Sequence, residues 1–411
     1  MAARIACVDL DTFFVSVERL LEPRLRGVPV VVGAVGWRGV VTSASYEVRA
    51  LGVKSGMPIA QARRLAPDAV YLPPRHGVYG DYAAQVREIL EEGTDAVATA
   101  SIDEFFVDFR GTERLWRTAR DVDDDAAIER RVRELREAVA ARVGLPCSAG
   151  IGATRAIAKM ASKQAKPHVG PHHGGVRMVR AGEELAFVSP QPVSAYPGLG
   201  PVTATALIEA GVHTLGDLLS LGPGPLRMRF GPIADRVRHG IESRPLPGQR
   251  DRPAFHEHDP VGSTVGSISN ERTFHADVGD RQRVEDQVRT LVERVCWRAR
   301  RRGVVARTVT LKLRLADFDT CTRGRSGPAT ADDASVLAVA RQLLDAAWTR
   351  SLPVRLVGIA LSNLEPAPAQ LALPLAAPGR PPVERALDAV RERFGFDAIR
   401  LGSTGRTSWV A

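Results

Sequence analysis

At 411 residues, the chain is too long for one ordinary hydrophobic core, so several domains are expected. Lys and Arg outnumber Asp and Glu by 56 to 47, and this excess favours nucleic acid, or less so an anionic membrane, as a partner, although an Arg- and Ala-rich genome has the same effect. The sequence has no Cys-x-x-Cys pair, membrane-length apolar run or signal-peptide core. We therefore expect no zinc knuckle, disulfide framework or membrane span. We expect a soluble, cytoplasmic protein.

Strands and helices alternate through the first 170 residues, which is typical of an α+β or α/β layer. Strands are expected at residues 4–8 and 28–33, twice within 95–109, and around 147–153. Helices are expected at residues 12–21, 45–52, 79–90, 126–144 and 154–166. The opening stretch "CVDLDTFF" (7–14) places Asp9 and Asp11 where a core strand ends, and a buried carboxylate needs a partner or a metal.

Two breaks in composition follow this first part. A charged stretch rich in Gly and His covers residues 166–176, and the Pro-rich, charged stretch 244–262 is expected to be a linker. Between them, residues 197–222 predict two short helices hinged at Gly198-Leu199-Gly200. These breaks separate the first part of the chain from its C-terminal third.

The pattern after the linker is β-α-β-β-α-β, which indicates a small separate domain. Its elements are expected at residues 264–274, 281–301, 306–316, 319–327, 332–349 and 353–363. The tail that follows is rich in Pro and Ala and holds a final helix at 383–395. The sequence contains no internal repeat.

Three carboxylates have the chemistry of a metal site. Neighbouring residues of a regular strand point to opposite faces, so Asp103 and Glu104 converge only if the two apolar strands turn between them. With Asp9 from another strand end, they would form an oxygen-rich cluster suited to Mg²⁺. Spacing alone leaves two alternatives open: Asp11 caps the helix at 12–21, and an Asp-Glu pair in a hairpin turn is merely solvated.

A second group has the chemistry of a phosphate site. Tyr46 and Arg49 are three residues apart on a short helix and share a face, where an Arg fork and a phenol can donate to phosphate oxygens. Ser43 and the helix N-terminus near Ser45 add donors. The alternative for Arg49 is an ordinary surface arginine.

Lysines near residue 160 are a further candidate. Lys159 belongs to a basic helical stripe, and such stripes are usually solvated. Lys166 differs because Pro167 follows it and pushes it out of helical geometry. Lys166 is therefore expected at a helix end, free to reach into a site.

Four blocks now occur in order: "VDLDTFFVSVE", "VVTSASYEVRALGVKSGMP", "SIDEFFVDF" and "KMASKQAKP". In sequence and spacing they resemble the blocks of Y-family DNA polymerases, above all the DinB (Pol IV) branch, and the resemblance spans residues 4 to about 363. It implies an α+β, multidomain right hand. The implied parts are a palm (1–11 and 76–170), fingers (12–75), a helix-hairpin-helix thumb (171–243), a linker (244–263), a β-α-β-β-α-β little finger (264–366) and a tail (367–411).

In that family the matching positions bind two Mg²⁺ ions, for which Mn²⁺ can substitute. The resemblance makes Asp9, Asp103 and Glu104 the catalytic and metal-binding carboxylates, and the Leu10 backbone carbonyl joins the second ion. It would also explain why a core strand ends with the carboxylate of Asp9.

The matching positions also bind the incoming nucleotide. Tyr46 and Arg49 would hold its β- and γ-phosphates, with help from Ser43. Lys166 would contact the triphosphate, and Lys159 is expected to be a DNA or structural contact.

Two aromatic residues and two small ones would border the nucleotide. Phe13 lies on the apolar stripe of its helix and is expected in the core. Phe14 lies off that stripe and matches the family's steric gate, which collides with a ribose 2′-hydroxyl. Val40 and Thr42 match the roof over the templating base pair. Both are slightly larger than alanine, which leaves open how bulky a lesion fits.

DNA contacts are expected in two further places. Gly198 and Gly200 would let backbone N–H groups approach a phosphate strand closely. Strand 308–315 alternates, and Lys312 and Arg314 on its polar face would contact the DNA backbone.

The tail contains a short apolar peptide flanked by Pro and Ala, which by itself would be a linker. Beside a polymerase it resembles a sliding-clamp-binding peptide of the form Gln-Leu-x-Leu-x-Leu. The matching residues are Gln370, Leu371, Leu373 and Leu375.

The sequence therefore predicts a monomeric, template-directed translesion DNA polymerase without proofreading, located in the cytoplasm at the nucleoid. Its partners would be primer–template DNA, deoxynucleoside triphosphates and a sliding clamp. The main alternative is an inactive, polymerase-shaped scaffold that binds DNA and a clamp, but such relatives typically lack the acidic residues that this chain keeps. An unrelated basic nucleic-acid-binding protein would not need Tyr46, Arg49 and Lys166 together.

Overall fold

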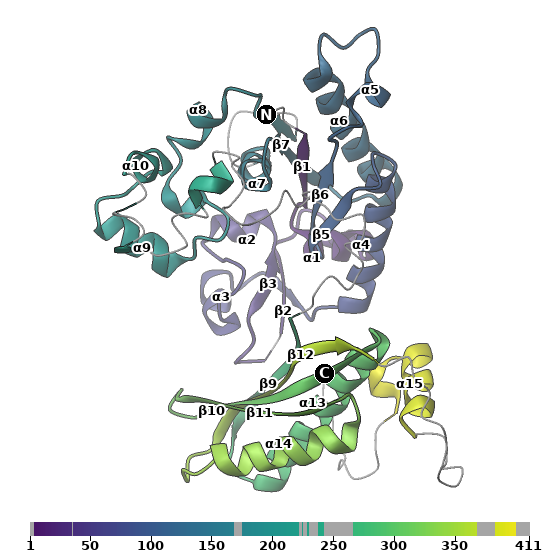
Figure 1. The fold of residues 1–411 in the computed structure, drawn as a ribbon, viewed down its shortest axis with the longest axis vertical. Coiled ribbons are helices and arrows are strands. Elements are labelled where there is room, and N and C mark those ends of the chain that lie inside the picture. The colour runs from purple at the N-terminus through teal and green to yellow at the C-terminus, as the bar shows by residue number, and fades with distance from the viewer. Residues whose placement is uncertain are drawn as a thin grey trace. The chain divides into compact units, whose positions relative to one another are not determined.

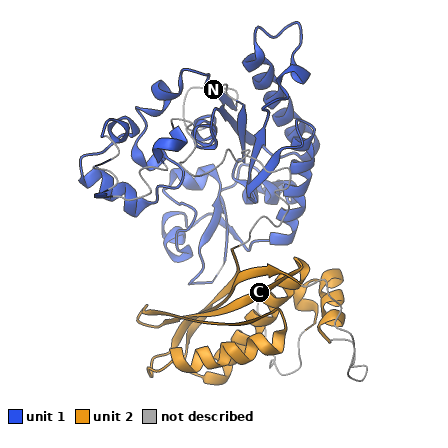
Figure 2. Cartoon of the chain, viewed as in Figure 1, with its two compact units in different colours: residues 1–259 blue, residues 260–411 orange. Residues whose placement is uncertain are grey.

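The computed structural model describes residues 4–34, 36–167, 175–221, 224, 228–229, 237–241, 266–367 and 383–399. Contacts divide the chain into two compact units, Met1–Asp259 and Pro260–Ala411 (Figure 2). The division falls within the predicted linker 244–263, which itself lies outside the described residues. Among the described helices, none has the length and apolar character needed to cross a membrane.

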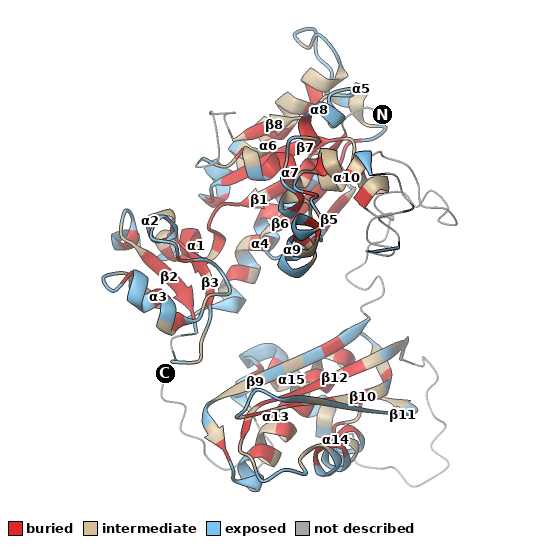
Figure 3. Cartoon of the chain, turned by 90° about the vertical axis from the view of Figure 1, so that its left-hand side faces the viewer, coloured by how far each residue is buried: buried red, intermediate tan, exposed pale blue. Residues whose placement is uncertain are grey.

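Unit 1 is built on a five-stranded sheet (Figure 1). In the order β5-β6-β1-β7-β8, its strands are Val97–Ser101, Glu104–Asp108, Ile5–Leu10, Cys147–Gly152 and Val176–Met178. Neighbours are antiparallel, except that β8 runs parallel to β7. The strand β1 is central and almost entirely buried (Figure 3), so a side chain at its end is held rigidly.

Helices cover both faces of this sheet. The helices that accompany it in the first 167 residues are α1 (Phe13–Leu21), the 3₁₀ turn η1 (Pro23–Leu25), α4 (His76–Glu91), α5 (Glu113–Trp116), α6 (Asp124–Val143) and α7 (Arg155–Gln164). The main core joins α1, α4 and α6 to one face, and α7 packs on the other. A Cβ at Gly150 would lie 2.0 Å from the backbone nitrogen of Ser162, so glycine is required for α7 to approach β7 this closely.

A smaller sheet with its own core carries the predicted phosphate residues. Its strands, in the order β3-β2-β4, are Val41–Ala44, Val30–Gly33 and Val70–Leu72, and its helices are α2 (Tyr46–Ala50) and α3 (Ile59–Leu65). The sequence analysis did not predict β3, β4 or α3. Each is short, and β3, which reads "VTSA", has only four residues, too few to show an alternating pattern.

The predicted helical hairpin is present, but the glycines lie elsewhere than expected. The described elements here are α8 (Glu184–Val188), the 3₁₀ turn η2 (Val193–Ala195), α9 (Pro201–Glu209) and α10 (Leu215–Ser220). Gly198, with φ +95°, and Gly200 precede α9 and join it to η2, whereas the prediction put them between the two helices. The turn between α9 and α10 is instead fixed by a capping box of Thr214 and Asp217.

Unit 2 is a four-stranded antiparallel sheet with two long helices on one face. In chain order its elements are β9 (Ser267–Val278), α13 (Arg281–Arg301), β10 (Val304–Leu315), β11 (Thr320–Thr330), α14 (Asp333–Ala347) and β12 (Val354–Pro366). The predicted β-α-β-β-α-β order is therefore correct, with α13 matching at both ends. The final helix α15 (Val383–Phe394), followed by the 3₁₀ turn η3 (Phe396–Ala398), pairs with α13 through Arg391 and Glu293.

Candidate active site

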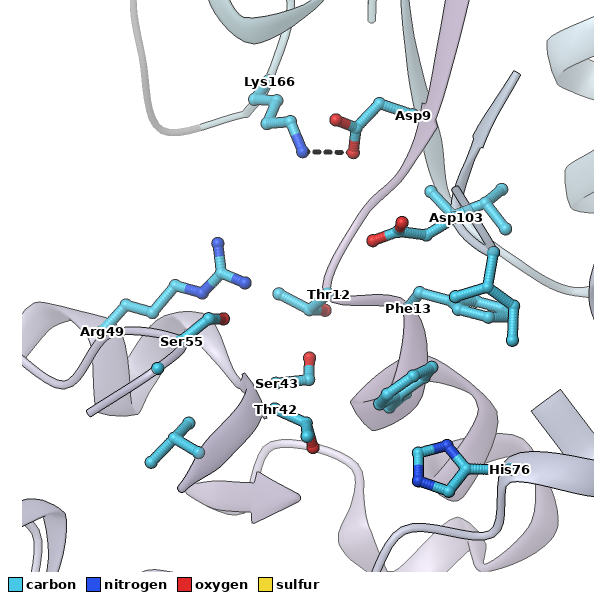
Figure 4. Close-up of a pocket in the computed structure, with 15 residues that line it drawn as sticks. Asp9, Thr12, Phe13, Thr42, Ser43, Arg49, Ser55, His76, Asp103 and Lys166 are labelled. Carbon is cyan, nitrogen blue, oxygen red and sulfur yellow. Dashed lines mark hydrogen bonds and ion pairs between the residues drawn. The ribbon is translucent and has the colours of Figure 1, made fainter. Parts of the chain in front are cut away.

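A pocket of about 600 Å³ lies where β1 ends, facing β3 and α2 of the smaller sheet. Figure 4 shows the carboxylates of Asp9 and Asp103 on one side of this space and Arg49 on the other. Ser43 and Thr42 line the same space side by side, and Lys166 reaches in beside Asp9. Most of the predicted carboxylate and phosphate residues therefore line one pocket, although they come from distant parts of the sequence.

The carboxylates meet because of strand pairing. Asp9 and Glu104 are directly opposite each other in the β1–β6 pair. Asp103 lies in the tight turn between β5 and β6, and its backbone carbonyl accepts a hydrogen bond from the Leu10 N–H at 2.9 Å. Asp9, Leu10 and Asp103 line the pocket, whereas Glu104 is buried and does not. The predicted turn is thus present, but it comprises Ile102 and Asp103, and Glu104 is the first residue of β6.

Two lysines neutralise these carboxylates. Lys166 Nζ lies 2.6 Å from an Asp9 oxygen, and Lys159 Nζ lies 2.9 and 2.6 Å from the two Glu104 oxygens. Burial raises the pKa of Asp9, and Lys166 opposes that rise. Burial acts to lower the pKa of Lys166, but Asp9 outweighs it and the pKa is raised. The attraction within this pair therefore favours the ionised form of each group, against the effect of burial.

In the parts of the chain that the structure describes, no three acidic, imidazole or thiol groups stand close enough together to hold a metal ion. The oxygens of Asp9 and Glu104 are instead paired with Lys166 and Lys159. The donor chemistry nevertheless fits a hard divalent cation, because Asp9 and Asp103, which carry carboxylates, and Leu10, which carries a backbone carbonyl, line one pocket.

Asp11 does not cap α1. The N-cap position is Thr12, which has φ +46° and no side-chain capping bond. Asp11 instead points inward and is buried, where it accepts hydrogen bonds from Ser148 at 2.9 Å and from the Tyr46 hydroxyl at 3.3 Å. Lys166 Nζ lies 3.5 Å away. The left-handed turn at Thr12 redirects the chain, so that Asp11 joins β1 to α2 and β7.

Of the predicted phosphate residues, Arg49 and Ser43 line the pocket opposite Asp9, Lys166 lines it beside Asp9, and Tyr46 lies outside its lining. Arg49 lines the pocket, and its Nε–H donates to the Ala44 carbonyl at 2.8 Å, which leaves the guanidinium pointing inward (Figure 4). Its guanidinium carbon lies 5.5 Å from the ring centre of Tyr46, so the two share a helix face as predicted. Burial and the charge of Asp11 raise the pKa of Tyr46, whose hydroxyl therefore stays a donor.

The aromatic wall extends beyond the two predicted residues. Phe13 is buried in the core and Phe14 is half-buried, as the helical periodicity predicts, and both line the pocket. Tyr79 stacks on Phe14 with ring centres 4.2 Å apart, and His76 meets Phe14 edge-on at 6.0 Å. Tyr79 and His76 were not predicted from the sequence as part of this wall. The three-residue spacing of His76 and Tyr79 is compatible with a helix. Only the packing of α4 on α1 shows that both side chains contact Phe14.

The residues predicted to form the roof and to contact DNA differ in where they lie relative to the pocket. Thr42 lines the pocket, while Val40 is half exposed and lies outside its lining. In unit 2, Lys312 is held by Glu271 at 2.9 and 3.0 Å, and Arg314 donates to Thr320. The clamp-peptide residues Gln370, Leu371, Leu373 and Leu375 lie outside the described residues.

Two family models match the two parts of the chain. The model of the impB/mucB/samB family matches residues 8–163, and the model of that family's C-terminal domain matches residues 265–373. Among solved structures, the "Y-family DNA polymerase chimera Dbh-Dpo4(243-245)-Dbh" superposes with a TM-score of 0.72 at 23% identity. It covers 88% of this chain and 99% of that one. The expected multidomain α+β polymerase fold is confirmed.

Curated relatives match over most of their length. DNA polymerase IV of Halorhodospira halophila (strain DSM 244 / SL1) is 37% identical over 369 residues, which cover 88% of this chain and 96% of the relative. DNA polymerase IV of Dehalococcoides mccartyi (strain CBDB1) is 32% identical over 409 residues, 98% of each chain. The chain therefore belongs to the Y family of DNA polymerases, in its DNA polymerase IV (DinB) class.

Proposed function

We propose that this DNA polymerase adds deoxynucleotides to a primer 3′-hydroxyl in translesion synthesis, using two divalent cations, Mg²⁺ by preference. The observation that carries the proposal is a single pocket with Asp9 and Asp103 on one side and Arg49 on the other. Carboxylates suit cations and an Arg fork suits phosphate, so the two walls fit a metal–triphosphate complex.

Asp9, Asp103 and Glu104, with the Leu10 carbonyl, are the residues that would hold the cations. DNA polymerases in general use such metal pairs, which activate the attacking hydroxyl and stabilise the leaving oxygen. Oxygen donors in a polar pocket fit this role, and the lysines now paired with Asp9 and Glu104 show that the carboxylates already bind positive charge.

The triphosphate would lie against the other wall. Arg49 offers a fork of N–H donors to the pocket and Ser43 a hydroxyl, and the Tyr46 hydroxyl, which now donates to Asp11, would turn toward the phosphates. Lys166 lies at the pocket edge, where its charge would stabilise the pyrophosphate that leaves. In this assignment all four residues bind or orient phosphate and none exchanges a proton with the primer.

The sugar and base would lie between the aromatic wall and the roof. Phe14 would exclude a ribose 2′-hydroxyl, with Phe13 packed behind it. Thr42 would border the base pair closely, and the exposure of Val40 leaves room beside it for a bulky template base.

The wider interactions are proposals of the same kind. The glycines before α9 and the polar face of β10, with Lys312 and Arg314, would grip the DNA backbone. We further propose that residues 370–375 bind a sliding clamp, that the chain is a monomer, and that it works in the cytoplasm at the nucleoid.

The testing experiment is primer extension with Asp103→Asn. The variant should lose nucleotide transfer while binding primer–template DNA as tightly as the wild type, because Asp103 would hold the cations and not DNA. Asp108→Asn is the matched control, since Asp108 is a buried aspartate at the far end of β6. Near-normal extension by Asp103→Asn would overturn the metal assignment, and a wild type unable to extend primers would favour the inactive scaffold.

A further inference from the structure

The ring of Phe14 rests on a support that lies behind the pocket. Tyr79 stacks on it with ring centres 4.2 Å apart and planes inclined by 14°. Tyr79 itself is fully buried and is absent from the pocket lining, so it cannot touch a nucleotide. The position of the Phe14 ring therefore depends on a residue that substrate does not contact.

Tyr79 is in turn fixed by a buried carboxylate. Its hydroxyl donates to Glu18 Oε1 at 2.6 Å, and Glu18 is 2% exposed. Arg75 clamps the same carboxylate, with Nε donating to Oε1 at 3.0 Å and Nη2 donating to Oε2. Burial and the hydrogen bond to Glu18 raise the pKa of Tyr79, so the phenol remains a donor at neutral pH.

The arrangement is a matched pair of helical turns. Phe14 and Glu18 are four residues apart on α1, and Arg75 and Tyr79 are four apart at the start of α4. Residues at this spacing lie one above the other on a helix face. When α1 packs on α4, the Phe14 ring therefore stacks on the Tyr79 ring. One helical turn away, the Glu18 carboxylate meets the Arg75 guanidinium and the Tyr79 hydroxyl.

A merely structural contact between two helices would not need this polar group. A buried carboxylate is expensive to desolvate, and apolar residues of the same size often stabilise a helix contact at least as well. What Glu18 adds is direction, because a charge-assisted hydrogen bond to a phenol fixes the ring's tilt and depth.

We infer that Glu18 is a positioning residue for sugar selection: with Arg75 it locks Tyr79, and Tyr79 holds the Phe14 ring where a ribose 2′-hydroxyl would lie. This inference rests on the proposed function, in which Phe14 excludes ribonucleotides. A ring that can tilt or retreat would admit the extra oxygen. Losing the lock should therefore relax discrimination without removing the ring.

The test measures kcat/KM for one ribonucleotide and for its deoxy counterpart, in the full chain with Mg²⁺ and a fixed primer–template. Glu18→Gln should raise the ribonucleotide-to-deoxynucleotide ratio about two- to tenfold, the range set by the orientation energy of an aromatic pair. Tyr79→Phe, which keeps the ring but loses the hydroxyl, should raise it similarly. Because the ratio is taken on one preparation, a change in the folded fraction cancels.

Matched variants separate the possible outcomes. Glu22→Gln removes an ion-paired carboxylate one turn further along, at the end of α1, and should leave the ratio unchanged. If Glu18→Gln adds nothing in a Tyr79→Phe background, the two act as one unit, as inferred. An independent, additive effect would overturn that link.

The failure of this inference is distinguishable from failure of the proposed function. If Phe14→Ala raises the ratio and Glu18→Gln does not, only the inference is wrong. If Phe14→Ala leaves the ratio unchanged, the gate assignment is wrong. A wild type that does not extend primers would overturn the proposed activity itself.

Discussion

Phe14 projects from the first turn of α1 into the pocket, and removing its ring should change which sugar the enzyme accepts. A ribose differs by one hydroxyl, and burying a hydroxyl without a partner costs about 1–3 kcal/mol. Each ~1.4 kcal/mol is about tenfold in rate. Phe14→Ala should therefore raise ribonucleotide use relative to deoxynucleotide use at least about tenfold, measured as a ratio of kcat/KM values.

The control for this prediction is Phe14→Tyr, which keeps an aromatic ring in place and should keep the wild-type ratio. Catalysis on deoxynucleotides should fall only moderately in Phe14→Ala, because the change removes a repulsion from ribose. An unchanged ratio would mean that the Phe14 ring does not meet the ribose and that sugar selection lies elsewhere.

Lys166 offers a second prediction at this scale. It borders the pocket and already binds an anionic oxygen of Asp9 at 2.6 Å. A charge-assisted hydrogen bond contributes about 1.5–3 kcal/mol, so Lys166→Met should raise the KM for a deoxynucleotide about tenfold or more. Lys163→Met, an exposed lysine on the preceding helix, should leave that KM unchanged. Equal effects of the two would show that only net charge matters.

The residues of the sequence motifs were predictable from the sequence, whereas the residues that position them were not. Asp9 and Asp103 stand out because a carboxylate at the end of an apolar strand needs a reason. Glu18 and Tyr79 carry no such signal, because each looks like an ordinary member of an amphipathic helix. Their role depends on how α1 packs on α4, which local periodicity does not contain. Asp11 was assigned to a cap for the same reason: the turn at Thr12 has no signature in sequence.

At the scale of elements, α15 is held to unit 2 by a buried ion pair. Arg391 is 1% exposed, binds Glu293 and lies over the ring of Phe396. Arg391→Met would leave Glu293 buried and without this cation, which costs about 3–5 kcal/mol for such pairs. We expect α15 to lose protection in amide hydrogen exchange, with urea unfolding shifted to lower concentration. Arg393→Met, on the exposed side of α15, is the control.

This loss should depend on pH. Burial raises the pKa of Glu293, while Arg391 opposes the rise. When the pKa of a carboxyl is higher in the folded than in the unfolded protein, the folded protein loses stability as the pH rises from the unfolded-state pKa through the folded-state pKa. The Arg391→Met variant should therefore be weakest at neutral pH and recover in mild acid, where Glu293 is protonated. Adding Glu293→Gln should recover most of the stability, and a double variant as weak as the single one would contradict the ion-pair explanation.

Elements were predictable in proportion to their length and periodicity. The helix α13 spans 21 residues with a regular apolar stripe, and its predicted bounds match the structure. The strands β3 and β4 have four and three residues, too few to show a period. They exist because the larger fold pairs them with β2, which is information from outside the segment.

At the scale of the whole molecule, the residues expected to bind the nucleotide and those expected to bind DNA are distributed over the two units. Unit 1 holds the pocket and the glycines before α9, and unit 2 holds the polar strand face with Lys312 and Arg314. Each unit has its own hydrophobic core. Substitutions in unit 2 are therefore expected to change DNA affinity and its salt dependence while leaving nucleotide selection intact.

The predicted clamp peptide belongs to this scale because it would connect the polymerase to a partner. In sequence it lies between β12 and α15 of unit 2, away from every residue that lines the pocket of unit 1. Replacing Gln370, Leu371, Leu373 and Leu375 by alanine keeps the chain length, so the docking of α15 should be undisturbed. Extension of short primers should then stay at the wild-type rate, while stimulation by the sliding clamp is lost. Pro374→Ala changes a position outside the Gln-Leu-x-Leu-x-Leu pattern and should keep the stimulation. Equal clamp affinity of wild type and quadruple variant in calorimetry would show that the peptide is only a linker.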